Sequence, residues 1–183
     1  MVKTLMLLNA VCLSCLLGSE SAFAQGASQA VRGAAAGLEG TVNDSQKPLT
    51  AGPEDTKEKA KPGKIDENAS KEFKTTPSGL KYRILRKTDG RKPVATDKVE
   101  VNYKGWLNDL KIFDSSYQRG QSIEFGLKQV IPGWTEGVQL MGVGEMIELD
   151  IPYQLAYGER GTPGGPIPPK AQLHFIVELI AIK

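Results

Sequence analysis

Few side chains in this sequence have the chemistry of a nucleophile, a proton shuttle or a metal ligand. The chain has one histidine, His174, and two cysteines, Cys12 and Cys15. A Ser-His-Asp triad would have to use His174, which we expect in mid-strand on the exposed face, opposite Leu173 and Phe175. No second histidine can share a metal ion, and the carboxylates lack ligand spacing. Neither G-x-S-x-G nor a phosphate-binding loop occurs. We therefore expect no metal or cofactor, and either binding or a reaction without a nucleophile.

The first residues have the pattern of a secretory signal peptide. Lys3 gives a short positive start, an apolar run covers residues 4–18, and Ala22-Phe23-Ala24 supplies small residues at the positions before a cut. The run is shorter than the roughly 20 apolar residues that span a bilayer as a helix. We predict a signal peptide over residues 1–24, cleaved before Gln25.

Both cysteines lie inside this segment, so the mature chain has no disulfide and no thiol nucleophile. The pattern predicts an exported protein, in the periplasm or, alternatively, secreted or in the ER lumen. An uncleaved N-terminus acting as a membrane anchor is a further alternative. The last alternative is a lipid attached to Cys15, although the leucine normally found three residues before such a cysteine is missing.

The charge of the chain excludes some classes of partner. The formal net charge is +2, and the lysines are scattered without interleaved aromatic residues, so we expect no nucleic acid ligand. No later run is apolar enough to cross a membrane, and we expect no membrane span after signal removal.

The composition and hydrophobic pattern of the chain change near residue 70. Residues 25–70 are rich in Ala, Gly, Pro, Lys and Glu and poor in large apolar residues, which predicts a disordered or low-complexity linker. From residue 71 onward, segments such as KVEVNYKGWL and AQLHFIVELIAI alternate apolar and polar residues, as strands do. One stretch, residues 134–141, suits a helix that starts at Gly133 and ends at a left-handed Gly142. We predict an α+β domain over residues 71–183, an antiparallel sheet with one short helix packed on it.

Six short motifs follow one another in this domain: VNYKG, IFDSS, VIPGW, AYGERG, PIPP and LHFIVEL. Together they resemble the FKBP-type peptidyl-prolyl cis-trans isomerases, the immunophilins that bind tacrolimus and rapamycin, over residues 75–183. The preceding TPSGLKYRIL is similar to the lead-in of exported bacterial members, including the macrophage infectivity potentiator class. The resemblance implies a twisted antiparallel sheet wrapped around one short helix. The long helical dimerisation region of that class has no counterpart here, and we expect a monomer.

The resemblance also implies a pocket between helix and sheet. Trp134 would be its floor, although plain core explains this residue equally well from sequence alone. Asp114 and its two serines also fit an ordinary turn, and Tyr103 and Phe175 fit the core by period. The implied substrate-binding residues are Tyr103, Phe113, Asp114, Ile123, Val130, Ile131, Trp134, Tyr157, Ile167 and Phe175, with Phe113, Asp114 and Tyr157 in catalytic roles.

The implied activity is cis-trans isomerisation of Xaa-Pro bonds in unfolded or extended polypeptides during the folding of exported proteins. Such a reaction needs no nucleophile, which agrees with the residues available. The alternative is a non-catalytic peptide-binding or holdase chaperone module that keeps the pocket. The sequence departs from the family pattern at Ile123, where an aromatic is common, and at Thr162, where some members have histidine. Leu110 replaces a turn glycine, so we expect local backbone strain there.

Overall fold

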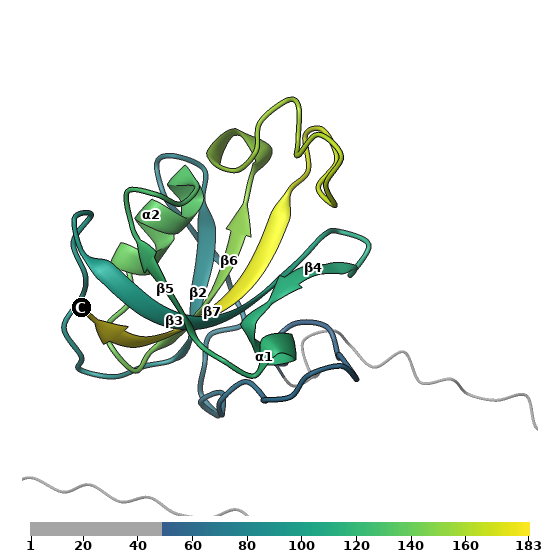
Figure 1. Cartoon of the computed structure of the whole chain (residues 1–183). Helices are drawn as coiled ribbons and strands as arrows, with labels where there is room; N and C mark the ends of the chain where they lie inside the picture. Colours follow the sequence, from purple (N-terminus) through teal and green to yellow (C-terminus); the bar gives the residue numbers. More distant parts are fainter. Residues whose placement is uncertain (1–48) are drawn as a thin grey trace, which may run out of the picture. The chain divides into compact units, whose positions relative to one another are not determined.

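The computed structural model describes residues 49–183 (Figure 1). The predicted signal peptide and the first part of the predicted linker lie outside the described residues. In chain order the elements are β1 (Lys74–Thr75), β2 (Lys81–Arg86), β3 (Lys98–Trp106), β4 (Ile112–Ser115), α1 (Ser116–Arg119), β5 (Ile123–Gly126), α2 (Pro132–Gln139), β6 (Met146–Ile151), η2 (Tyr153–Leu155) and β7 (Leu173–Ile182).

The strands form one antiparallel sheet in the order β1-β2-β6-β7-β3-β4, with β5 also paired to β3. Strand β7 lies in the middle, between β6 and β3, so that Phe175 faces Leu149 on one side and Gly105 on the other. Helix α2 packs on the twisted sheet (Figure 1). The predicted α+β fold is therefore confirmed, and the structure adds two short elements, α1 and η2, that the sequence analysis did not predict.

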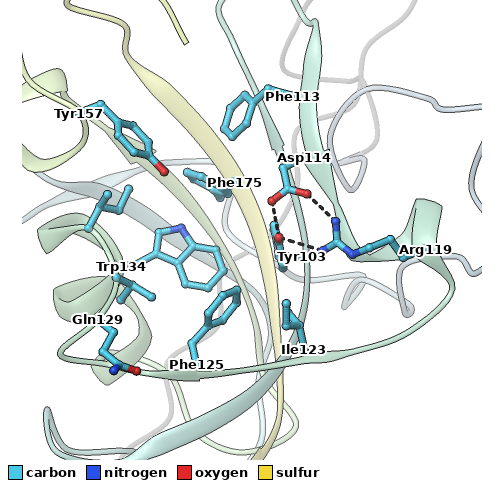
Figure 2. Close-up of a pocket in the computed structure, with 12 residues that line it drawn as sticks. Tyr103, Phe113, Asp114, Arg119, Ile123, Phe125, Gln129, Trp134, Tyr157 and Phe175 are labelled. Atoms are coloured by element: carbon cyan, nitrogen blue, oxygen red, sulfur yellow. Dashed lines mark hydrogen bonds and ion pairs between the residues drawn. The ribbon is translucent and has the colours of Figure 1, made fainter. Parts of the chain in front are cut away.

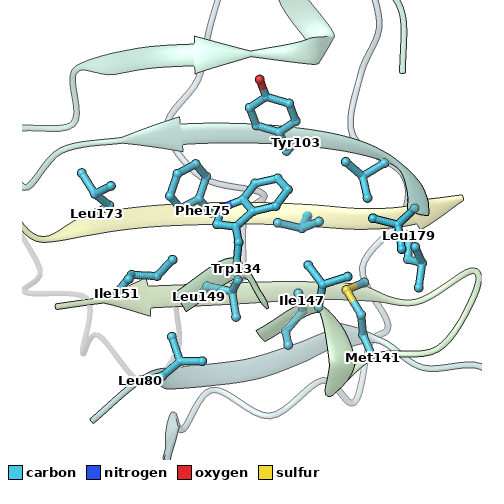
Figure 3. Close-up of a cluster of buried hydrophobic side chains, with 14 of the residues drawn as sticks. Leu80, Tyr103, Trp134, Met141, Ile147, Leu149, Ile151, Leu173, Phe175 and Leu179 are labelled. Carbon is cyan, nitrogen blue, oxygen red and sulfur yellow. The ribbon is translucent and has the colours of Figure 1, made fainter. Parts of the chain in front are cut away.

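The main core lies between α2 and the sheet (Figure 3). Alternation along β6 and β7 places Ile147, Leu149 and Ile151 beside the inward residues of β7. The helix comes close to the sheet because α2 carries glycine where it meets β6. A Cβ atom at Gly137 would lie 2.7 Å from Leu149 Cδ1, and one at Gly133 would lie 2.4 Å from Ile151 Cγ2.

The bounds of α2 differ from the predicted 134–141. The helix starts two residues earlier, because Pro132 occupies its first turn, where a missing N–H costs nothing. It ends at Gln139, and Leu140 follows in a right-handed conformation. Gly142 is not left-handed, so that prediction is wrong; a Cβ there would lie 2.3 Å from the carbonyl oxygen of Gly90. The glycine is needed for close backbone approach rather than for a helix cap.

The opposite, outer face of the sheet is covered by residues 49–66, which we call the strap. The strap contains no helix or strand, yet Leu49, Ala51 and Ile65 pack on a second apolar cluster made of Leu85, Trp106, Met146 and Ile176. The structure thus corrects the linker prediction for this stretch. Its few apolar residues are too sparse to form a core of their own, but they suffice to cover one that the sheet provides.

His174 also lies on the outer face, as predicted, but it is half-buried rather than exposed. Its ring stacks on Trp106 at 5.8 Å between centroids, and its Nε2 is 2.6 Å from Asn108 Oδ1. Packing on a neighbouring strand therefore explains this residue, which has no role in the pocket described next.

Candidate functional site

Trp134 forms the floor of a hollow between α2 and the sheet (Figure 2). It is 4% exposed, and three aromatic rings meet it edge-on. The ring centroids of Tyr103, Phe125 and Phe175 lie 5.2, 5.6 and 5.3 Å from that of Trp134, at interplanar angles of 89°, 78° and 86°. Edge-to-face geometry suits the quadrupoles of the rings and fixes their orientation. The result is a preformed apolar receptacle rather than a filled core.

The hollow is a cavity of about 620 Å³, a size common for small-molecule and peptide side-chain sites. All but one of the residues expected to bind substrate line it. The lining residues are Tyr103, Phe113, Asp114, Arg119, Ile123, Phe125, Gln129, Val130, Ile131, Trp134, Tyr157 and Phe175.

Ile167 is the exception. It is 5% exposed and packs in the main core from the loop between η2 and β7. Thr162 holds it there: Ile167 N–H donates to Thr162 Oγ1 at 3.1 Å, and the Ile167 carbonyl accepts from Thr162 N–H at 2.9 Å. Thr162, noted as a departure from the family pattern, thus closes this loop on itself.

Three polar side chains form a network at the rim of the cavity (Figure 2). Tyr103 donates its hydroxyl hydrogen to Asp114 Oδ2. Arg119 donates from Nη1 to Asp114 Oδ1 at 2.6 Å and from Nη2 to the Tyr103 hydroxyl at 2.9 Å. Burial, followed by the hydrogen bond to Asp114, raises the pKa of Tyr103 to about 12. Tyr103 is therefore a neutral donor at all physiological pH values, and the Asp114 carboxylate is already engaged.

Among the hydrogen-bond donors at the cavity, the Tyr157 hydroxyl and the Ile131 amide have no acceptor within residues 49–183. The hydroxyl of Tyr157 is directed toward the cavity in Figure 2, from a side chain that is 43% exposed. Burial and the negative charge of Asp114 raise its pKa, so it keeps its proton at neutral pH. The Ile131 amide precedes α2, where the helix has no side-chain cap. Both donors are available to a bound peptide.

Arg119, Phe125 and Gln129 also line the cavity, although no sequence pattern singled them out. Phe125 lies two residues from Ile123 on β5, so alternation alone could have found it. Arg119 gave no such signal, because it depends on α1, a four-residue helix too short to leave a periodic pattern. Gln129 lies in the turn after β5, where no pattern predicts side-chain direction.

Within residues 49–183 no three histidine, cysteine or acidic side chains come together as a metal site. None of the helices in that range is both long and apolar enough to cross a membrane. The cavity thus offers aromatic walls and a few fixed hydrogen-bond donors, the composition of a site for an apolar ring attached to a peptide backbone.

The fold and the cavity define a class of protein: a short helix held by a twisted sheet over an aromatic proline-sized pocket. A family model described as FKBP-type peptidyl-prolyl cis-trans isomerase matches residues 89–180, half of the chain. The chain belongs to this family.

Relatives and solved structures agree with the assignment. The chain is 54% identical over 117 residues to an FKBP-type peptidyl-prolyl cis-trans isomerase FkpA of Aeromonas hydrophila, covering 63% of this chain and 43% of the relative. It is 47% identical over 110 residues to the peptidyl-prolyl cis-trans isomerase Mip of Coxiella burnetii, covering 60% and 47%. The crystal structure of FkpA from Escherichia coli superposes with a TM-score of 0.59 at 48% identity, covering 62% and 53%. The chain therefore spans about half the length of the curated relatives it matches.

Proposed function

We propose that this protein is a peptidyl-prolyl cis-trans isomerase that accelerates rotation about Xaa-Pro bonds. The observation that carries the proposal is the Trp134 floor with three aromatic rings set edge-on around it. Such a box binds the proline ring by area and shape. The proposed substrates are unfolded or extended polypeptides.

The reaction suits an apolar pocket. Rotation about an Xaa-Pro bond faces a barrier of about 20 kcal/mol, because the planar amide must lose its partial double bond. In the twisted state the carbonyl oxygen carries less negative charge than in the planar state. A water-poor aromatic pocket therefore favours the twisted amide over the planar one, which lowers the barrier without any covalent step.

The donors at the rim have distinct roles in this proposal. Tyr157 and the Ile131 amide bind carbonyl groups that flank the rotating bond, so that the proline stays in the box while the chain turns. Phe113, which meets Phe175 edge-on at 5.5 Å, closes one side of the mouth. Asp114 is bound by Arg119 and Tyr103. It acts through charge and by orienting the Tyr103 wall, and it transfers no proton.

The test is cis-to-trans isomerisation of an apolar-Xaa-Pro peptide by the purified protein. We expect saturable acceleration that rapamycin inhibits. The double variant Trp134→Ala/Tyr157→Phe should lose most of it, on the order of tenfold or more in kcat/KM. A folded wild type that gives no acceleration contradicts the isomerase and leaves a binding or holdase module. If the protein accelerates isomerisation but rapamycin does not inhibit it, the isomerase proposal stands and only the expected rapamycin binding is contradicted.

We further propose that residues 71–183 form the isomerase domain, together with the strap, and that the protein is exported. The proposal of export rests on the apolar run and the Ala-Phe-Ala sequence before residue 25. Cell fractionation with mass determination of the mature N-terminus tests it, and retention of residues 1–24 in a soluble cytoplasmic protein would contradict it. The predicted monomer is tested by light scattering of the mature chain.

A further inference from the structure

Helix α1 is the element that presents Arg119 to the cavity, yet it has only four residues. A helix this short is unstable alone, so its position depends on what holds it. On the sheet side Ser116 Oγ accepts from Tyr103 N–H at 2.9 Å, and the Ser115 side chain caps the first turn. Those contacts fix the start of α1. Arg119 is the last residue of the helix, so its position depends on what holds the other end.

The end of α1 is held by the strap. The Lys59 and Ala60 amides both donate to the carbonyl oxygen of Tyr117, at 2.9 and 3.2 Å. Gln118 Nε2 donates to Asp55 Oδ2 at 2.6 Å. In Figure 1 the strap, in blue, runs past α1 on the side away from α2. The same carbonyl accepts from the Gly120 amide of the helix cap at 3.1 Å, so the strap adds two further donors at the end of α1.

The strap is in turn fixed to the sheet by buried charges. Lys104, 2% exposed, binds Glu58 at 2.7 Å and the carbonyl of Pro53 at 2.9 Å. Glu178 Oε1 accepts from the Gly63 amide at 2.9 Å and from the Tyr117 hydroxyl at 2.5 Å. A buried charge that loses its partner destabilises the fold, so these pairs fix the position of the strap on the sheet. Glu178, on β7, contacts both the strap and α1.

We propose that the strap is a positioning element of the pocket, and that Asp55 is its positioning residue. Asp55 holds Gln118, which keeps the end of α1 where Arg119 can bind both Asp114 and Tyr103. The inference rests on the proposed isomerase function for its kinetic consequence. A loosened α1 leaves the aromatic box intact but frees one wall of the mouth, so the consequence is weaker substrate capture rather than slower rotation.

The variant to make in the full-length mature protein is Asp55→Ala, with Asp66→Ala as the matched control. The Asp66 side chain accepts from the Lys87 amide at 2.9 Å, so it links the strap to the residue after β2 and does not reach α1. We expect Asp55→Ala to raise KM for an Xaa-Pro peptide about threefold at unchanged kcat. A merely structural loss, which lowers the folded fraction, would reduce apparent kcat and leave KM alone. The control should change neither.

Two further measurements test whether Asp55 affects KM through α1 and Arg119. In an Arg119→Ala background, Asp55→Ala should have no additional effect on KM, because its target is gone. Equal effects in both backgrounds would overturn the proposal. Amide hydrogen exchange at Gln118 and Gly120 should accelerate in Asp55→Ala and not in Asp66→Ala. This readout holds even if the wild type proves inactive, and unchanged exchange would overturn the inference independently of the isomerase assay.

Discussion

Leu110 is held in a backbone conformation that suits glycine. It sits in the turn between β3 and β4 with φ of 65° and a side chain that is 64% exposed. The left-handed region costs a residue with a Cβ about 1–2 kcal/mol, and no core contact offsets this. Leu110→Gly relieves this strain, but glycine also gives the unfolded chain more conformational entropy, which offsets part of the gain. We expect a net rise of about 1 kcal/mol in the free energy of unfolding, measured by urea denaturation. Asp109→Gly is the control, and it should destabilise the protein.

Tyr103 gives a second prediction at the same scale. Its pKa is raised from 10.0 to about 12 in the folded state. Its stabilising contribution is therefore complete below pH 10 and is lost as the pH rises toward 12. The wild type should lose more stability than Tyr103→Phe over this range, by on the order of 2 kcal/mol. Urea unfolding of both proteins at pH 9 and pH 11.5 measures the difference, and parallel loss in the two would contradict the assignment.

At the scale of elements, the distance between α2 and β6 sets the depth of the pocket. Gly137 lies against Leu149, whose Cδ1 would be 2.7 Å from an added Cβ. We expect Gly137→Ala to destabilise by about 1–2 kcal/mol, because overpacking outweighs the gain of about 1 kcal/mol in helix propensity. The added methyl group should also push α2 away from β6, which should change the fluorescence of Trp134 on that helix. Gln139→Ala, on the same helix and without this close approach, should alter neither quantity, whereas a stabilised Gly137→Ala would show that α2 can move freely.

The strap gives the second element-scale prediction. In the Lys104–Glu58 pair the side chains are 3% and 10% exposed. Glu58→Gln leaves a buried ammonium group without its counter-charge, so it should lower the free energy of unfolding by about 3 kcal/mol. Adding Lys104→Met should recover most of that loss in urea denaturation. Glu67→Gln, which breaks an ion pair exposed at 82% and 87%, should leave stability unchanged. Equal losses in the two single variants would show that burial of the pair contributes nothing.

At the scale of the whole molecule, the sequence predicted what depends on alternation and on ordered motifs. The inward faces of β3, β6 and β7 follow from period two, and the confirmed fold follows from them. The strap was missed because its stability comes from contacts with residues distant in the sequence, such as Glu58 with Lys104 and Gly63 with Glu178. Arg119 was missed because α1 is too short to leave a periodic pattern, and Ile167 was expected at the pocket but is bound by Thr162 within its own loop. Sequence patterns report periodicity, whereas the strap depends on distant partners, and Arg119 and Ile167 depend on a short helix and a single contact within a loop.

The place of β7 in the sheet has a consequence for how the protein is made. The last strand of the chain, Leu173–Ile182, pairs with both β6 and β3 and joins the two halves of the sheet. A chain is synthesised from its N-terminus, so the pairings that β7 makes with β6 and β3 cannot form on the nascent chain until β7 has been made. Most pairings also link distant segments, which slows folding. Until β7 has been made, the chain stays unfolded and can still pass through a narrow channel, which suits the export proposed above.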